Sequence, residues 1–157
     1  MNAGESAIDR APIEQSTMVR SGVEHTFGVF VREIGRWWPT QPFSQGGERV
    51  THVVFEEAVG GRVYEVWDDG SEQTWGHVLV WEPPTRFRIT WELLPEVTEV
   101  EVQFRGLSPG LTRVELVHSG WDRLTHEQIA AATQLLGGYT AGWQHILATF
   151  AATAAGP

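Results

Sequence analysis

Residues 97–119 read VTEVEVQFRGLSPGLTRVELVHS, and this stretch decides the fold of the chain. Apolar and polar residues alternate over 97–105, and a second strand-like segment, 111–119, follows the Ser-Pro-Gly turn at 108–110. Alternation with a period of two predicts strands that bury one face. Because the turn is so short, the two strands must form an antiparallel hairpin.

Four more strand-like segments lie upstream of this hairpin, and turn signals separate them. They cover residues 50–56, 62–67, 74–82 and 87–91. The Asp69-Gly70 turn after the second of them is the strongest hairpin signal in the chain. None of the connections has room for a crossover helix, so the six strands predict an antiparallel meander. A further, imperfect strand fits residues 13–20, which gives a sheet of six to seven strands.

Helical periodicity occurs on both sides of the meander. Apolar residues recur at helical spacing over Val23–Trp37, where one or two short helices are expected before Pro39. In the C-terminal part, Thr125 and Gln128 form a capping box, and the apolar stripe that follows predicts one helix over about Thr125–Ala152. A helix of that length can bury its stripe only by lying across the sheet. We therefore predict an α+β helix-grip fold, in which a curved antiparallel sheet wraps around the long C-terminal helix.

Three glycines, Gly137, Gly138 and Gly142, fall in the middle of the predicted C-terminal helix. Each lowers helix stability relative to alanine by up to ~1 kcal/mol. They are compatible with a kink, with a close crossing or with a weak helix, and we favour a close approach to the sheet.

Length and composition predict one domain. The chain has 157 residues, of which 41% are hydrophobic and 20% charged. Residues 1–12 are polar and predict a flexible tail, and residues 13–157 form the helix-grip domain. The chain has no cysteine and no lysine, which excludes disulfides, thiolate chemistry and a lysine Schiff base.

Charge and hydropathy argue against two classes of partner. The net charge is −9 and no basic cluster interrupts it, which disfavours nucleic acid and anionic membrane surfaces. No apolar run reaches the about 18 residues that a membrane helix needs. The first fifteen residues do not have the pattern of a signal peptide, so we expect a cytoplasmic protein.

Several short motifs follow one another along the chain. They are GRWWP at 35–39, GGRVYE at 60–65, WGHV at 75–78, WEPP at 81–84, HSGW at 118–121 and GW at 142–143. In this order they resemble the bacterial branch of the heat-shock-protein-90 ATPase activator homologue-like family, within the START-like (birch-pollen-allergen-like, SRPBCC) superfamily. The resemblance covers residues 13–152. It implies a helix-grip fold with a cavity, in a superfamily whose members bind apolar molecules and include some cyclases and hydrolases.

Two titratable residues are candidates for chemistry on the apolar side of the sheet. His118 follows Val114 and Leu116 on the last strand, where it serves either as a ligand contact and base or as a half-buried histidine satisfied by the helix or by water. We favour the second interpretation. Glu65 shares a strand face with Val63. If that face is concave, Glu65 is a buried carboxylate suited to acid or base work; if it is convex, Glu65 is solvated.

Metal and cofactor motifs are not found at the spacing they require. His126 and Glu127 begin like HExxH, but Ala130 stands where the second histidine is needed. GxSxG, GxGxxG and P-loop motifs are also absent from the sequence. We expect no bound metal and no cofactor, and we assign no catalytic residue.

The aromatic and aliphatic residues of the sheet give two further predictions. Eight of them are expected to point at the C-terminal helix, namely Phe87, Ile89, Trp91, Val100, Val102, Phe104, Val114 and Leu116. Over 74–82 the alternation places apolar residues on both faces of the strand. One face would then be uncovered, which predicts a self-association surface and hence a homodimer.

The first functional hypothesis is a module that binds a small apolar or aromatic molecule between the sheet and the C-terminal helix. Its predicted ligand-binding residues are Trp37, Glu65, Val78, Phe87, Trp91, Val102, Phe104, His118 and Trp143. His118 is the expected polar contact. The alternatives are a cyclase- or hydrolase-type enzyme that uses Glu65 or His118 in the same cavity, and a co-chaperone-like protein-interaction module. The sequence favours a binding protein over an enzyme, and it does not identify the ligand.

Overall fold

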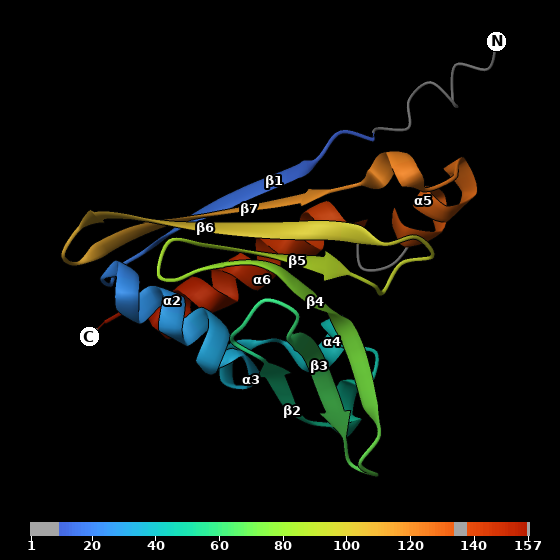
Figure 1. Ribbon diagram of the computed structural model, residues 1–157, viewed down its shortest axis with the longest axis horizontal. Coiled ribbons are helices and arrows are strands. Elements are labelled where there is room, and N and C mark those ends of the chain that lie inside the picture. Colours follow the sequence, from blue (N-terminus) through green and yellow to red (C-terminus); the bar gives the residue numbers. More distant parts are fainter. Residues whose placement is uncertain (1–9, 134–137, 157) are drawn as a thin grey trace.

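Seven antiparallel strands form one curved sheet in the computed structural model, which describes residues 10–133 and 138–156 (Figure 1). The strands are β1 (Ile13–Val19), β2 (Val50–Phe55), β3 (Arg62–Trp67), β4 (Glu72–Glu82), β5 (Arg86–Trp91), β6 (Thr98–Ser108) and β7 (Leu111–Ser119). Their spatial order is β1-β7-β6-β5-β4-β3-β2. The meander from β2 to β7 is therefore confirmed. The first strand, β1, pairs with β7 and forms one edge of the sheet.

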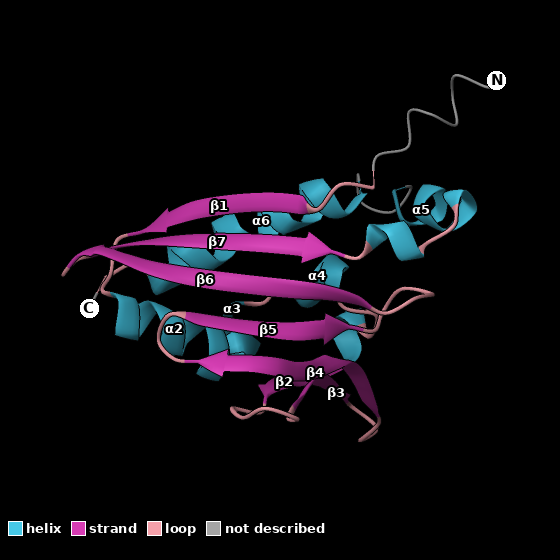
Figure 2. Ribbon diagram, turned by 45° about the horizontal axis from the view of Figure 1, so that its top comes forward, coloured by secondary structure: helices cyan, strands magenta, loops and turns pink. Residues whose placement is uncertain are grey.

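Helices gather on one side of the sheet, as Figure 2 shows. They are α2 (Val23–Arg32), α3 (Ile34–Trp37), α4 (Thr40–Phe43), α5 (His126–Thr133) and α6 (Gly138–Ala154), with 3₁₀ turns η1 (Gly47–Arg49) and η2 (Trp121–Arg123). The long helix α6 buries Leu147 and Phe150 in the same core as the inner face of the sheet. This arrangement confirms the predicted α+β helix-grip fold.

The C-terminal helix differs from its prediction as a single element. The structure has two helices, α5 and α6, on either side of residues 134–137. Gly138 has φ +89°, a left-handed conformation that α-helical geometry does not accommodate. The predicted capping box at the start is confirmed, because Thr125 and Gln128 exchange hydrogen bonds of 2.9 and 3.2 Å.

The predicted close approach of the glycines to the sheet is also wrong where the structure describes it. Gly142 lies against α4 instead, since a Cβ atom on Gly142 would stand 3.3 Å from Cε1 of Phe43. Gly137 lies outside the described residues. Gly138 therefore allows the break at the start of α6, and Gly142 allows α6 to pack closely against α4.

The eight sheet residues predicted to point at the C-terminal helix are confirmed as interior, although some of them pack on α2. All eight are at most 5% exposed, and they belong to one cluster with α2, α3 and α6. Phe27 and Phe30 of α2 pack on Phe87 and Phe104 at ring-centroid distances of 5.0–6.3 Å. The middle of the concave face is thus filled by side chains of α2.

Strand β4 does not expose two apolar faces. Its pairing with β3 and with β5 contains one register irregularity each, so that Trp75, Val78 and Trp81 all turn inward. Trp81 packs on Phe27 and Phe55 at 5.4 and 5.8 Å. Strict alternation would place Val78 opposite the two tryptophans, which is why the sequence suggested a second apolar face.

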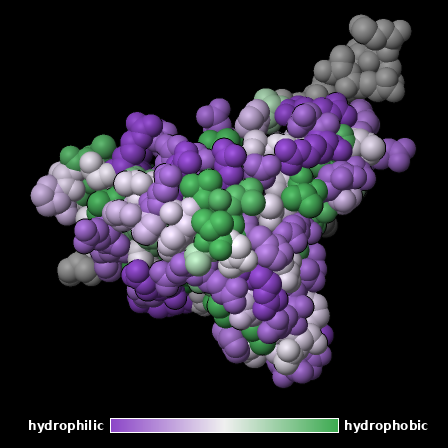
Figure 3. Space-filling view, viewed as in Figure 1, coloured by the Kyte–Doolittle hydropathy of each residue, from purple (hydrophilic) through white to green (hydrophobic). Residues whose placement is uncertain are grey.

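The outer surface gives little support to a broad apolar interface. Large apolar side chains that are exposed lie on different elements, namely Met18, Val59, Leu79, Val97 and Leu107. The face drawn in Figure 3 is mostly hydrophilic, with a hydrophobic patch near its centre. The homodimer stays a prediction, but its original argument from β4 no longer holds.

Candidate functional site

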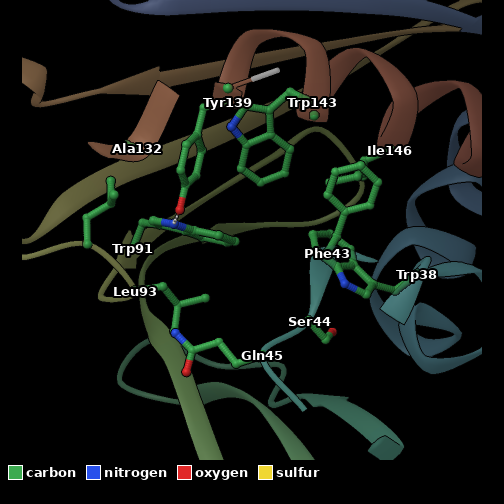
Figure 4. Close-up of a pocket in the computed structure, with 13 residues that line it drawn as sticks. Trp38, Phe43, Ser44, Gln45, Trp91, Leu93, Ala132, Tyr139, Trp143 and Ile146 are labelled. Atoms are coloured by element: carbon green, nitrogen blue, oxygen red, sulfur yellow. Dashed lines mark hydrogen bonds between the residues drawn. The ribbon is translucent and has the colours of Figure 1, made fainter. Parts of the chain in front are cut away.

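A partly open pocket of about 420 Å³ lies where the first turns of α6 meet the end of β5 and the segment that follows α3 (Figure 4). Its lining residues are Trp38, Phe43, Ser44, Gln45, Trp91, Leu93, Leu94, Ala132, Gly138, Tyr139, Gly142, Trp143 and Ile146. All of these residues carry uncharged side chains. Five are aromatic, so the walls are mainly π surface.

The aromatic walls are held by ring contacts between elements that are distant in sequence. Trp91 ends β5, and its ring stands 5.2 Å from that of Trp143 on α6, at an angle of 65°. Its indole Nε1–H donates to the Tyr139 hydroxyl at 3.3 Å. Trp38, directly after α3, packs edge-on against Trp143 at 6.2 Å. The sheet, α6 and the segment after α3 therefore each contribute at least one ring.

Six side-chain polar groups belong to this apolar wall, and two of them, the indole N–H groups of Trp91 and Trp143, donate to Tyr139 and to His118. The Tyr139 hydroxyl accepts the Trp91 hydrogen bond, and burial raises the pKa of Tyr139 above its usual value. The Gln45 amide belongs to an exposed side chain. The Trp38 Nε1–H and the Ser44 hydroxyl are buried and have no hydrogen-bond partner among the described residues.

His118 does not line the pocket, although its ring contacts three residues that do, namely Trp91, Tyr139 and Trp143. Its ring is fully buried, with centroids 5.9 Å from those of Trp91 and Trp143. Nδ1 lies 3.0 Å from Trp143 Nε1, and Nε2 lies 2.7 Å from Thr98 Oγ1. Because an indole N–H can only donate, Nδ1 is the acceptor and Nε2 carries the proton. Burial lowers the pKa of His118 to about 3, so the ring is neutral at physiological pH.

His118 is not among the residues that line this pocket, and its role as the polar contact of a ligand stays a prediction. Both ring nitrogens are engaged by Thr98 and Trp143, so the favoured structural interpretation fits, with α6 supplying one partner. The ring is fully buried rather than half-buried. His118 acts on the pocket through the wall residue Trp143.

Glu65 lies on a buried face of β3, which decides the orientation that the sequence left open. Its carboxylate accepts hydrogen bonds from the indole N–H groups of Trp67 and Trp75 at 2.7 and 2.8 Å, and from Gly46 N at 2.9 Å. Both of its oxygens accept hydrogen bonds, and Glu65 is not among the residues that line the pocket. Through these hydrogen bonds Glu65 connects the loop after α4 with strands β3 and β4.

Two of the nine predicted ligand-binding residues, Trp91 and Trp143, line the pocket. The other seven are buried elsewhere, namely Trp37, Glu65, Val78, Phe87, Val102, Phe104 and His118. The reason is that side chains of α2 and α3 fill the middle of the concave face, whereas this pocket lies at one end of the sheet. Ligand contact stays a prediction for all nine.

Sequence reasoning missed the residues that follow α3. No helix or strand was predicted for residues 40–49, yet Phe43, Ser44 and Gln45 come from this segment, and Trp38 precedes it. The available signal was the doubled tryptophan before Pro39, followed by a further aromatic residue, Phe43. Tyr139 was also missed, because it falls beside the glycines.

Residues 10–133 and 138–156 contain no group of three or more histidine, aspartate or glutamate side chains that could hold a metal ion. Among the helices of the same residues, none combines the length and apolarity needed to cross a membrane.

A curved antiparallel sheet that grips a C-terminal helix beside an apolar pocket defines a helix-grip protein. Within that class, residues 23–155 match the sequence profile of the family described as activator of Hsp90 ATPase homolog 1-like protein. The chain belongs to this family, which confirms the resemblance found in the sequence. No curated protein matches the chain in sequence.

Solved structures extend the comparison. The anthrahydroquino-γ-pyrone synthase Txn09 is 32% identical, with TM-score 0.59 over 90% of this chain and 96% of that one. The self-sacrificing resistance protein CalC from Micromonospora echinospora is 25% identical, with TM-score 0.70 over 92% and 94%. Protein NE0264 from Nitrosomonas europaea shares the fold at 16% identity, with TM-score 0.65 over 92% and 95%.

Proposed function

We propose that the protein binds a neutral aromatic small molecule in the pocket between α6 and the end of the sheet. The observation that carries this proposal is the lining: five aromatic side chains around about 420 Å³, with no charged side chain among the described lining residues. This volume lies in the range of small-molecule pockets, which combine apolar walls with a few polar groups.

The chemistry of the walls favours a ligand with a flat π system. Aromatic rings attract one another in offset or edge-to-face arrangements, beyond the gain from area burial. Figure 4 shows open space between Trp91 on one side and Phe43 and Ser44 on the other. Apolar surface transferred there from water contributes about 25 cal/mol per Å². A charged ligand would lose hydration without meeting an opposite charge.

The similarity to Txn09, which extends over 90% of this chain, supports the same conclusion. The name of Txn09 describes a synthase of an anthrahydroquino-γ-pyrone, which is a fused aromatic ring system. A related pocket in this chain would accept a molecule of comparable shape.

The test is a titration of the purified protein with flat neutral aromatic compounds, followed by calorimetry, with Ala132→Phe as the blocked variant. Ala132 lines the pocket, so a phenyl ring there should occupy the ligand volume and lower affinity at least about tenfold. Its neighbour Ala131 is exposed on the same helix, and Ala131→Phe should bind as the unmodified protein does. Equal affinity of the two variants would contradict the proposal.

A second candidate function is catalysis in the same pocket, favoured by the 32% identity to a synthase. Tyr139 would be the proton donor, because it is the titratable residue among the described lining residues; burial raises its pKa, so the hydroxyl keeps its proton until a stronger base forms on the ligand. Mass spectrometry of bound compounds after incubation separates the two functions. A binding protein returns the compound unchanged, whereas an enzyme returns a product whose formation Tyr139→Phe abolishes.

A further inference from the structure

One buried side chain supports a large part of the aromatic wall. His118 is fully buried near the end of β7 and is not among the lining residues. Its ring centroid lies 5.4 Å from that of Tyr139 and 5.9 Å from those of Trp91 and Trp143. These are three of the five aromatic residues in the lining, and Figure 4 shows them together on one side of the open space. His118 therefore packs, from outside the pocket, against much of the π surface that is available to a ligand.

Hydrogen bonds through His118 connect the two tryptophans of this group. Trp143 Nε1–H donates to Nδ1 of His118 at 3.0 Å, and Nε2–H of His118 donates to Thr98 Oγ1 at 2.7 Å. The Thr98 hydroxyl donates in turn to the backbone oxygen of Trp91 at 3.5 Å. His118 and Thr98 are both fully buried, so water does not compete for the bond between them. The path joins α6 to the end of β5, and both elements carry rings of the wall.

The direction of these hydrogen bonds leaves His118 with one tautomer. An indole N–H can only donate, so Trp143 requires a lone pair on Nδ1, and the proton of the neutral ring lies on Nε2. Thr98 Oγ1 accepts from this Nε2–H, which fixes both the tautomer and the orientation of the imidazole ring. The other tautomer would turn an N–H of His118 toward the N–H of Trp143. The indole of Trp143 is thus anchored by His118, and it packs on the rings of Trp38 and Trp91.

We infer that His118 is a positioning residue, which holds the indole of Trp143 in one orientation and thereby makes the pocket selective for flat ligands. The inference rests on the proposed function and adds a determinant of ligand shape. Stacking depends on the angle and offset between rings, so a wall ring selects for planarity only while its own orientation is fixed. Without an acceptor at position 118, the unpaired indole N–H would draw Trp143 toward another partner. The wall would then accept a bulky ligand as readily as a flat one.

The experiment compares 2-naphthol with 1-adamantanol, neutral alcohols with the same number of carbon atoms, of which the first is flat and the second cage-shaped. Calorimetry with the full chain should show that the unmodified protein binds 2-naphthol at least about tenfold more tightly. His118→Leu removes the acceptor and should reduce this preference to about threefold or less. His118→Asn is the matched variant, because both side chains branch at Cγ and the amide oxygen takes the place of Nδ1. It should keep most of the preference, and so should His25→Leu, a control on the exposed side of α2.

A second measurement follows the indole of Trp143 in the free protein by NMR of isotope-labelled samples. The Nε1–H signal of Trp143 should move in His118→Leu and stay near its original position in His118→Asn, because the hydrogen bond is lost only in the first variant. If a variant at position 118 does not fold, Thr98→Val decides, since it removes the partner of Nε2. Thr98→Val should also reduce the preference for 2-naphthol, whereas Thr98→Ser, which keeps the hydroxyl, should not.

Equal affinity of the unmodified protein for both compounds would overturn the inference and leave the proposed function standing. An unchanged preference in His118→Leu would do the same. An equal loss of preference in His118→Leu and His118→Asn would overturn it as well, because His118 would then contribute packing alone. If 2-naphthol does not bind the unmodified protein, the proposed function fails and the inference fails with it.

Discussion

Glu65 is the residue whose surroundings are most specific. Its carboxylate accepts three N–H donors in a fully buried position. In Glu65→Gln an amide NH₂ replaces one oxygen, so a donor faces a donor with nearly unchanged shape. We expect a loss of about 1–3 kcal/mol in the free energy of unfolding, measured in urea. Glu48→Gln on the surface should change it by less than about 0.5 kcal/mol, and an equally small loss at Glu65 would contradict this account.

His118 should make stability depend on pH. Its pKa is 6.5 in the unfolded chain and about 3 in the fold, where burial disfavours the charged ring. The unfolded state therefore binds a proton first as pH falls below 6.5. Stability is fully present above 6.5 and is lost progressively towards pH 3, at up to ~1.4 kcal/mol per pH unit.

A glutamine at position 118 isolates this effect. In His118→Gln the side chain still offers an acceptor to Trp143 and a donor to Thr98, but it does not titrate between pH 6.5 and 5. Urea denaturation at several pH values should give a shallower loss of stability for the variant in that range. The other five histidines are common to both proteins. Parallel curves would show that His118 is not responsible.

The roles of these two residues could be predicted from the sequence only in part. The apolar neighbours of His118 in sequence were enough to favour a satisfied histidine. Its partners Thr98 and Trp143 lie 20 and 25 residues away, and no local pattern reports such contacts. For Glu65, the alternation along the strand does not show which face is buried, so the sequence could not place its side chain inside or outside.

At the scale of elements, β4 shows where alternation fails. Two register irregularities bring Trp75, Val78 and Trp81 to one face at a spacing of three residues. An irregularity of this kind inserts a residue into one strand and reverses the facing of all that follow, so a pattern of period two cannot predict it. The strands themselves, with their turns, were predictable because each is defined by its own few residues.

Gly76 tests the closeness of β4 to its neighbour. A Cβ atom there would lie 1.6 Å from the backbone oxygen of Thr90 on β5, and neither strand can move alone. We expect Gly76→Ala to lower the free energy of unfolding by about 3 kcal/mol, the upper end of overpacking effects. Gly110→Ala is the control, since its Cβ would meet nothing within 4 Å. Thermal denaturation of both variants is the measurement, and similar melting temperatures would refute the expected close approach.

For the whole molecule, the sequence predicted a cavity between the sheet and the C-terminal helix, and most of the residues predicted to line it fill the core beside the pocket instead. The centre of the concave face is filled because α2 is a regular amphipathic helix whose phenylalanines reach the sheet. The pocket gathers residues from the segment after α3, the end of β5, α5 and α6. Each of these segments is predictable as an element, but their convergence depends on how far each helix extends over the sheet.

The division of the core leads to a prediction about local stability. A small cluster of Trp121, Leu124 and Ile129 is separate from the main core, and Ile13, Leu94 and Tyr139 pack against it. Helix α5 is held mainly through this cluster, whereas β6 pairs with a strand on each side. Local openings need less free energy where fewer buried contacts must separate. Amides of α5 should therefore exchange with deuterium before those of β6.

Hydrogen–deuterium exchange followed by mass spectrometry or NMR measures this difference directly. We expect the opening free energy of α5 to be lower than that of β6 by at least about 1.4 kcal/mol, a tenfold difference in exchange rate. Because Ala132 and Tyr139 line the pocket, a bound aromatic compound should slow exchange in α5 more than in β6. If α5 and β6 exchange together at the rate of global unfolding, the small cluster is part of the main cooperative unit. In that case pocket ligands would stabilise the molecule as a whole, without a preferential effect on α5.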